Sequence, residues 1–263
     1  MHQPFAIFER TALSLAGLTF RSQSPLAKLE GDARGQLAWV RSLGFRAVVL
    51  DGTAEQIRAR NLDRTARRDL ASHMRRNDLL FAGVDLFIPP THISDPAHQD
   101  RAFAAIKESL TLASDLAALI AGSPPLVSIL APPSLSAKDI EALAQIADSS
   151  PSRLALIAWP VSDQLRTALA SVPKLGLAFD PARVLAISAD PAKELSRLKP
   201  APASIRLNDF DGVGRVALGK GNLDFTQYIV AASVANFAVP LILDVGGLAD
   251  AQAAIAAAIS LAS

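Results

Sequence analysis

Charged side chains stand at or just after the ends of several short apolar runs of the sequence. They are Asp180, Arg183, Arg206, Asp209 and Asp244. A guanidinium group offers its N–H donors in a rigid fork that matches a carboxylate or a phosphate. These residues therefore predict one of two arrangements: ion pairs that act as internal scaffolding, or a site that binds an anionic group of a ligand.

His92 is the best candidate for acid and base chemistry at such a site. It follows the turn-forming residues Pro89-Pro90-Thr91, just past the apolar run 79–88. Imidazole changes its charge near neutral pH, so it can accept and donate a proton there. The alternative is a loop histidine that caps the next helix. Together with Asp180 and Asp244, whose role is implied by the resemblance described below, His92 makes up our predicted set of catalytic residues.

Trp159 is the aromatic candidate for a ligand-binding residue. It follows the apolar run 154–158, where an indole ring can stack on the apolar face of a sugar. It can equally fill space at the end of that strand. Trp159, Arg183, Arg206 and Asp209 make up our predicted set of substrate-binding residues.

The glycine-rich segment 212–221 does not predict a nucleotide cofactor. Gly212, Gly214 and Ala217 match the G-x-G-x-x-A pattern of dinucleotide-binding folds, but helix-like sequence begins only several residues later. The pattern binds a pyrophosphate only where its glycines lead directly into a helix. Lys220 is followed by glycine and not by the Ser or Thr of a phosphate loop. We predict a long loop here and no bound cofactor.

Eight short apolar runs alternate with longer amphipathic stretches along the chain. The runs cover residues 13–20, 47–50, 79–88, 126–130, 154–158, 176–179, 204–207 and 240–244. They are apolar on both faces, which is typical of parallel strands covered by helices on each side. Between them, apolar side chains recur every three or four residues, as at 101–121, and this spacing predicts amphipathic helices.

Helix start signals agree with this alternation. Ser94-Asp95-Pro96 and Asp190-Pro191 each offer an N-cap residue followed by proline, and Ser136 with Asp139 resembles a capping box. Strand–helix units that recur at roughly thirty-residue intervals fit a closed barrel better than an open sheet. We predict an α/β protein with the (β/α)8 TIM barrel fold, as a single domain over residues 1–263.

Composition and charge exclude several classes of function. Of the 263 residues, 50% are hydrophobic and 19% are charged, the formal net charge is +1, and there are no cysteines. Evenly mixed charges give no field that would hold a nucleic acid. No apolar run reaches the roughly 20 residues that span a bilayer, and the N-terminus lacks a signal-peptide pattern. We predict a cytoplasmic protein that binds neither nucleic acid nor membrane. A homodimer is compatible with the sequence.

Four stretches resemble the xylose isomerase-like TIM barrels, which are the sugar phosphate isomerase/epimerase group. They are LGFRAVVLDG, LAFDPARVLAISADP, IRLNDF with the later GKGNLDF, and VPLILDVGG. The resemblance implies a divalent metal at the carboxyl end of the barrel. Its implied ligands are a Glu after the fifth strand, the Asp of a D-x-x-H pattern, the His of an H-x-K-D pattern and a Glu at the last strand. The resemblance also implies a small carbohydrate substrate, with the two glutamates as acid and base.

The sequence departs from this pattern at most of the metal-binding positions. Ala158 and Trp159 stand where the first glutamate is expected, and Asp244 stands in place of the last one. Arg183 and Arg206 replace the two histidines. A guanidinium stays protonated, offers only donors and repels a cation. We therefore predict a barrel with a degenerate site and no bound metal.

Two functions follow from these departures. The first is a sugar isomerase/epimerase-like barrel that binds a small sugar or sugar acid, or isomerises it without a metal. The second is a non-catalytic descendant, either ligand-binding or structural, whose arginines close the old site. If the carboxyl end of the barrel, which we call its mouth, is open and its arginines are unpaired, the first function is favoured. If Trp159 and Arg206 fill the mouth, the second function is favoured.

Overall fold

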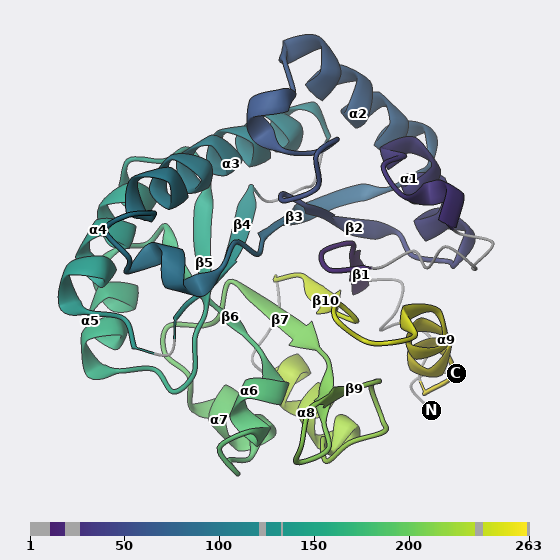
Figure 1. The fold of residues 1–263 in the computed structure, drawn as a ribbon. Coiled ribbons are helices and arrows are strands. Elements are labelled where there is room, and N and C mark those ends of the chain that lie inside the picture. The colour runs from purple at the N-terminus through teal and green to yellow at the C-terminus, as the bar shows by residue number, and fades with distance from the viewer. Residues whose placement is uncertain (1–10, 19–26, 121–124, 133, 235–238, 262–263) are drawn as a thin grey trace.

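The computed structural model describes residues 11–18, 27–120, 125–132, 134–234 and 239–261. In this part of the chain, parallel strands close into a barrel in the order β1-β10-β7-β6-β5-β4-β3-β2 (Figure 1). The barrel strands are β1 (Thr11–Ser14), β2 (Ala47–Asp51), β3 (Leu80–Leu86), β4 (Leu126–Leu130), β5 (Arg153–Ile157), β6 (Leu175–Phe179), β7 (Ser204–Leu207) and β10 (Leu241–Leu243). The predicted (β/α)8 TIM barrel is confirmed.

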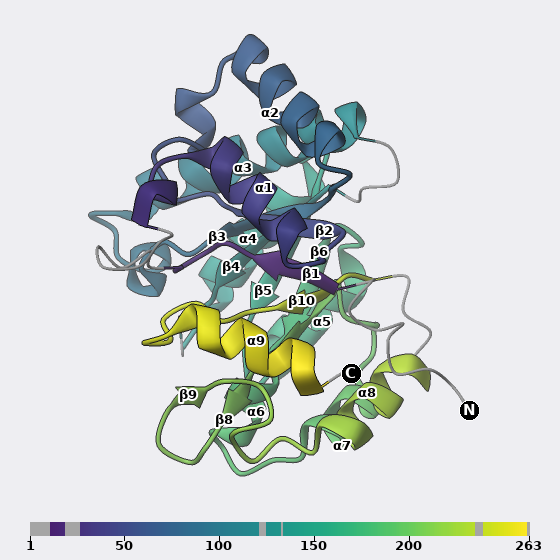
Figure 2. The ribbon, with the colours of Figure 1, turned by 90° about the vertical axis from the view of Figure 1, so that its right-hand side faces the viewer.

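Helices surround the barrel and cover the outer face of the strands (Figures 1 and 2). They are α1 (Ala33–Ser42), α2 (Arg64–Arg76), α3 (Gln99–Leu119), α4 (Ala137–Asp148), α5 (Asp163–Ser171), α6 (Pro181–Leu185), α7 (Pro191–Arg197), α8 (Phe225–Val234) and α9 (Ala251–Leu261). Short 3-10 helices lie at Ala27–Leu29, Ala59–Asn61 and Pro90–Ile93. None of the helices described is long and apolar enough to cross a membrane.

The predicted position of the first strand is wrong by several residues. The strand covers Thr11–Ser14 instead of 13–20, and residues 19 and 20 lie outside the described part of the chain. Gly17 has a φ of 69°, a left-handed conformation that ends extended structure and that glycine adopts without steric cost. The apolar run therefore continues into a turn that hydrophobicity alone does not reveal.

The predicted helix caps differ in accuracy. Asp190 caps α7, and Ser136 with Asp139 forms the predicted capping box at α4. The start signal at 94–96 is misplaced, because α3 begins at Gln99. The Asp95 carboxylate instead accepts a hydrogen bond from the Ala97 N–H over 3.0 Å, so it caps the turn before the helix.

The barrel interior changes from apolar to charged toward the carboxyl ends of the strands. Side chains two residues apart on a strand face the same side of the sheet. Ala12 of β1 and Ile242 of β10 belong to a small buried cluster of strand residues. Ser14 and Asp244 stand two residues further along these strands and are also buried. A polar layer therefore lies above an apolar one inside the barrel.

A bulge in β3 turns Asp85 toward the same interior. The pairing with β2 passes directly from Phe81 to Gly83 and leaves out Ala82. Such a bulge adds one residue and re-aims the side chains that follow, so Ala82 and Asp85 both face inward although they are three residues apart. Gly83 has a φ of 138°, and a Cβ there would lie 2.9 Å from the Leu126 carbonyl oxygen. The bulge therefore requires glycine.

Candidate functional site

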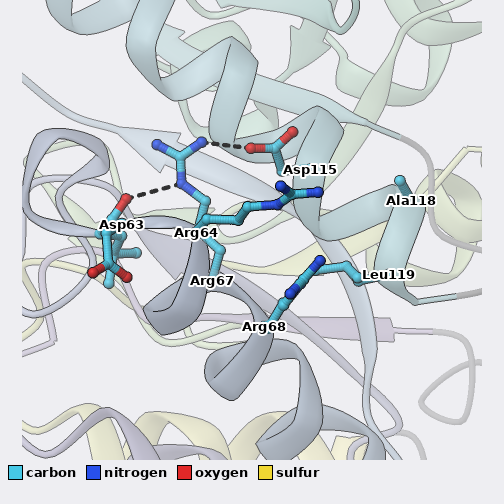
Figure 3. Close-up of a pocket in the computed structure, with 8 residues that line it drawn as sticks. Asp63, Arg64, Arg67, Arg68, Asp115, Ala118 and Leu119 are labelled. Carbon is cyan, nitrogen blue, oxygen red and sulfur yellow. Dashed lines mark hydrogen bonds and ion pairs between the residues drawn. The ribbon is translucent and has the colours of Figure 1, made fainter.

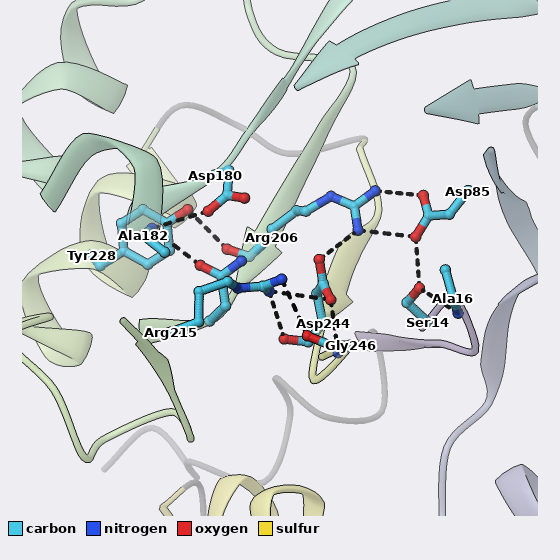
Figure 4. A network of polar contacts seen from close by, with 11 residues as sticks. Ser14, Ala16, Asp85, Asp180, Ala182, Arg206, Arg215, Tyr228, Asp244 and Gly246 are labelled. Carbon is cyan, nitrogen blue, oxygen red and sulfur yellow. Dashed lines mark hydrogen bonds and ion pairs between the residues drawn. The ribbon is translucent and has the colours of Figure 1, made fainter. Parts of the chain in front are cut away.

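Arg206 crosses the carboxyl end of the barrel from β7 to the opposite strand, β3 (Figure 4). Its Nη2 donates to Asp85 Oδ1 over 2.5 Å and its Nη1 donates to Asp85 Oδ2 over 2.9 Å, which makes the pair bidentate. Nη1 also donates to Asp244 Oδ2, just past β10, over 3.0 Å. Ser14 of β1 donates its hydroxyl to Asp85 Oδ2 over 2.6 Å. One fully buried guanidinium thus ties four strands together.

The buried carboxylates keep Arg206 protonated. Burial acts to lower the pKa of the guanidinium, but Asp85 and Asp244 outweigh burial and raise its pKa above the ordinary value. Burial raises the pKa of Asp85, and Arg206 opposes this rise only in part. Tyr228 of α8 fixes the backbone at this point by donating its hydroxyl to the Arg206 carbonyl oxygen over 3.0 Å. Arg206 is therefore a permanent cation in the barrel.

Arg215 brings a second positive charge from the loop after β7. The loop contains a short antiparallel ribbon of β8 (Asp209–Phe210) and β9 (Arg215–Val216). Arg215 Nη2 lies 3.2 Å from Asp244 Oδ1 and donates to the Asp244 carbonyl oxygen over 3.1 Å. With Asp85, Asp244 and Arg206 it completes a cluster of two cations and two anions, which we call the Arg206 cluster. Its formal charge is zero.

Asp244 is held in its ionised form by this cluster. Burial acts to raise the pKa of its carboxyl group, but Arg215, Arg206 and the N–H of Gly246 outweigh burial and lower the pKa. The Gly246 N–H donates to Asp244 Oδ1 over 3.1 Å. A carboxylate with this pKa has no proton to donate at neutral pH.

Asp180 and Asn208 stand at the ends of β6 and β7, next to the cluster. Both accept a hydrogen bond from the Ala182 N–H, over 3.0 Å at Asp180 Oδ1 and 3.1 Å at Asn208 Oδ1. Asp180 thereby caps α6. Asn208 Nδ2 and Arg206 Nε are buried and have no hydrogen-bond partner in the part of the chain described. Buried donors without an acceptor are rare. Arg153 Nε and Ser204 Oγ are two further buried atoms without a partner among the described residues.

Asp209, a predicted substrate-binding residue, holds the loop after β7 in place. Its Oδ2 accepts from the N–H groups of Gly219 and Gly221 over 3.1 and 3.0 Å. Its Oδ1 accepts from those of Phe210 and Leu223 over 2.8 and 2.9 Å. The carboxylate thus uses both oxygens on the backbone of its own loop.

Trp159 and Arg183 line a small cavity of about 120 Å³ at the ends of β5 and β6. The Trp159 ring packs edge-on against Phe179, with 5.4 Å between ring centroids. Arg183, in α6, is partly exposed and has no ion pair among the described residues. The cavity therefore combines an aromatic wall with a free guanidinium.

His92 lies in the 3-10 helix after β3, in a different place from the cluster. Its ring stacks on His98, with 4.3 Å between centroids. It lines a cavity of about 320 Å³ whose other lining residues include Arg58 and Glu108 but neither Arg206 nor Asp244. The structure thus brings Arg206 together with Asp244 and Asp180, and Trp159 together with Arg183, while His92 stands apart.

Sequence reasoning missed Ser14, Asn208 and Arg215 as members of this site. A signal existed for Asn208, which stands two residues beyond Arg206 and so shares its face of the strand. Asp85 lies within the apolar run 79–88 and was not among the predicted site residues. Gly83 inside an apolar run is a sign of a bulge, and this bulge is what aims Asp85 at Arg206.

The fold and the site define an α/β barrel with a buried charge cluster at the carboxyl ends of its strands. No family model matches the sequence, and no curated protein matches it. Solved structures do match. The xylose isomerase domain protein from Planctomyces limnophilus gives a TM-score of 0.73 at 16% identity, over 97% of this chain and 96% of that one.

Two further solved structures have the same fold. A xylose isomerase-like TIM barrel protein from Mycobacterium smegmatis, in complex with magnesium, gives a TM-score of 0.69 at 15% identity, over 100% of this chain and 97% of that one. The 3-keto-D-glucoside 4-epimerase from E. coli gives 0.69 at 12% identity, over 96% and 98%. The chain therefore has the xylose isomerase-like TIM barrel fold, and the resemblance noted in the sequence is confirmed at the level of the fold.

Proposed function

We propose that this protein is a sugar isomerase/epimerase-like barrel that binds a small carbohydrate or sugar acid without a divalent metal. The observation that carries the proposal is the Arg206 guanidinium, which lies between the carboxylates of Asp85 and Asp244. The guanidinium places a positive charge at the carboxyl end of the barrel, where the xylose isomerase-like barrels hold their metal ion. A cytoplasmic location and the absence of a nucleic-acid partner remain predictions.

The residues at the mouth do not fit a divalent ion. Such an ion needs carboxylate oxygens or neutral imidazoles, and the cluster's two carboxylates are already bound to Arg206. Within the described residues, no group of three or more His, Asp or Glu side chains is placed to hold a metal. An ion beside Asp244 would also meet the charges of Arg206 and Arg215. We therefore derive no metal-dependent step.

Arg183 offers donors that a carbohydrate can reach, because it is partly exposed and makes no ion pair with a described residue. Arg206 Nε and Asn208 Nδ2 also lack acceptors, but both atoms are fully buried, and neither residue lines the small cavity beside Trp159. Trp159 and the unpaired Arg183 line the same cavity. Its volume of about 120 Å³ is below the usual size of a small-molecule site, so it suits one anionic substituent of a sugar acid, held by the guanidinium, and not a whole sugar ring. The similar structure of a 3-keto-D-glucoside 4-epimerase supports a carbohydrate as the ligand class.

A non-catalytic descendant of such barrels, either ligand-binding or structural, is the second candidate. Arg206 favours it, because this arginine is fully buried and paired with Asp85 and Asp244 and so fills the end of the barrel. The acid and base candidates favour it as well. Proton transfer needs a group that changes its protonation near neutral pH, whereas Asp244 is held ionised by two arginines and Asp180 caps α6. His92 lies at a separate cavity. If the protein catalyses a metal-independent isomerisation, we expect Asp180 or His92 to carry the proton.

Calorimetric titration with Mn²⁺, Co²⁺ and Zn²⁺ tests the metal-free part of the proposal. We expect the chelator-stripped protein to bind none of these ions stoichiometrically. Stoichiometric binding by the wild type that disappears in Asp180→Ala would overturn the proposal, because it would show that substitute ligands form a metal site.

A thermal-shift screen of aldoses, ketoses and sugar acids tests the ligand part. We expect sugar acids to stabilise the wild type, and Arg183→Ala to weaken the best ligand by about tenfold, as for the loss of a charged hydrogen-bond partner. Arg166→Ala is the matched control, because Arg166 is exposed on α5. Equal losses in both variants, or no ligand among the sugars, would count against a carbohydrate site at the mouth.

A further inference from the structure

Helix α2 begins with an unusual concentration of positive charge. Arg64, Arg67 and Arg68 fall among its first five residues, and its first turn contains no acidic residue. The N-terminus of a helix carries the positive end of the helix dipole, where cations are unfavourable. Arg64 and Arg68 are also four residues apart, so their like charges repel on one face of the helix. The sequence thus places cations where the helix tolerates them least.

These arginines line the cavity shown in Figure 3, which lies between α2 and α3 on the outside of the barrel. Its volume is about 490 Å³, within the usual range for small-molecule sites. Leu62, just before α2, and Ala118 and Leu119, in α3, add apolar surface to the cavity. Figure 3 shows the arginine side chains directed toward α3. The cavity therefore combines charged and apolar lining residues.

The acidic residues of the cavity are already engaged, and two of its arginines are not. Arg67 Nη1 lies 2.5 Å from Asp115 Oδ2, and Asp63 caps α2 by accepting from the Ala66 N–H over 2.8 Å. Arg64 and Arg68 make no side-chain hydrogen bond or ion pair with any described residue. Two uncompensated positive charges therefore border the cavity.

We propose that this cavity binds a phosphomonoester that carries a small apolar or planar organic group. A phosphate dianion between Arg64 and Arg68 neutralises both charges and relieves their mutual repulsion, and guanidinium groups match phosphate oxygens in geometry. The organic group lies against Leu62, Ala118 and Leu119. This site is separate from the mouth of the barrel and is independent of the function proposed there.

Calorimetry with phenyl phosphate, inorganic phosphate and phenol tests the proposal. We expect phenyl phosphate to bind the wild type about tenfold more tightly than inorganic phosphate, because its ring buries apolar surface, and phenol not to bind. The double variant R64Q/R68Q should lose at least about tenfold in affinity for phenyl phosphate. The control R101Q/R166Q removes the same charge from exposed positions on α3 and α5 and should bind like the wild type. Arg183→Ala should also bind like the wild type.

A second measurement needs no ligand. In phosphate-free buffer of low ionic strength, Arg64→Gln should melt at a higher temperature than the wild type, because it removes a like-charge contact, and phosphate should then stabilise it less than the wild type. A lower melting temperature, or equal stabilisation by phosphate, would contradict the proposal.

Three binding results would overturn the small-molecule site. They are no binding of phenyl phosphate by the wild type, an equal loss in R64Q/R68Q and R101Q/R166Q, and binding to phosphatidylglycerol vesicles without any response to phenyl phosphate. The last result would assign the arginines to a membrane surface.

Discussion

At the scale of single residues, Arg206 joins strands across the barrel through buried ion pairs. A buried ion pair costs desolvation that its Coulomb energy repays only when the geometry is good and the remaining hydrogen bonds are made. Here the pair with Asp85 is bidentate, and the cluster as a whole is neutral because Arg215 matches the second carboxylate, Asp244. Removing any one member leaves an uncompensated charge in the barrel.

We expect Asp85→Ala to destabilise the protein by about 3–5 kcal/mol, which is the usual cost of removing one partner of a buried pair. Arg206 would keep only Asp244, and β3 would lose its link to β7. Urea unfolding at pH 7 measures the change. Asp115→Ala is the control, since it breaks the exposed pair with Arg67 and should cost about 0.2–1 kcal/mol. Similar costs for the two variants would show that the Arg206 cluster adds little stability.

The lowered pKa of Asp244 predicts a dependence of stability on pH. Its folded-state pKa lies below the unfolded value of about 3.9. Its contribution to the free energy of unfolding is therefore fully present above that pH and is lost as the pH falls through the folded-state pKa. We expect the stability difference between wild type and Asp244→Asn to be largest above about pH 5 and to shrink toward pH 2. Urea unfolding at a series of pH values measures it, and a constant difference would refute the expectation.

Among the elements, the loop from β7 to α8 shows how a carboxylate can shape a backbone. Asp209 accepts four backbone N–H groups, and the loop so formed carries Arg215 to Asp244. Two glycines of this loop, Gly219 and Gly221, therefore help to shape it by donating their N–H groups to Asp209. The comparison of the sequence with nucleotide-binding motifs did not suggest this role.

We expect Gly221→Ala to destabilise the protein by about 1–3 kcal/mol, as overpacking usually does. A Cβ at Gly221 would lie 2.4 Å from Asp209 Oδ1 and 2.6 Å from the Phe210 carbonyl oxygen. Gly214→Ala is the matched control in the same loop, because nothing lies within 4 Å of its Cβ position. Thermal unfolding of both variants distinguishes a packed loop from a loose one, and equal melting temperatures would show that Asp209 does not hold it.

The sequence predicted the helices and strands well, because the spacing of apolar residues that reveals them depends only on neighbouring positions in the chain. Strands such as β4 and β7 have the predicted bounds. The number and spacing of the strand–helix units, together with the resemblance to xylose isomerase-like barrels, predicted the closure of the sheet. The site was harder to predict, because its contacts join residues far apart in the chain. Arg206 pairs with Asp85, which is 121 residues away, and only the bulge at Gly83 turns that aspartate inward.

At the scale of the whole molecule, the helices differ in how much charge they carry. Helix α2 carries five arginines and one aspartate, whereas α8 and α9 carry no charged residue. A charged face near α2 suits a small anionic ligand. Helix α8 can meet a second copy of itself without burying an unpaired charge of its own, and a two-fold axis brings the same patch of both copies together.

The homodimer is therefore the last prediction, and α8 is the face on which we expect it. Val230 is 56% exposed and Val234 is 78% exposed, and they stand four residues apart on one side of the helix. We expect light scattering after size-exclusion chromatography to give twice the mass of the chain. Val230→Glu should shift the protein to monomer, because two buried like charges would then face each other across the axis. Gln164→Glu places the same charge on exposed α5 and should leave the dimer intact, whereas a monomeric wild type would refute the prediction.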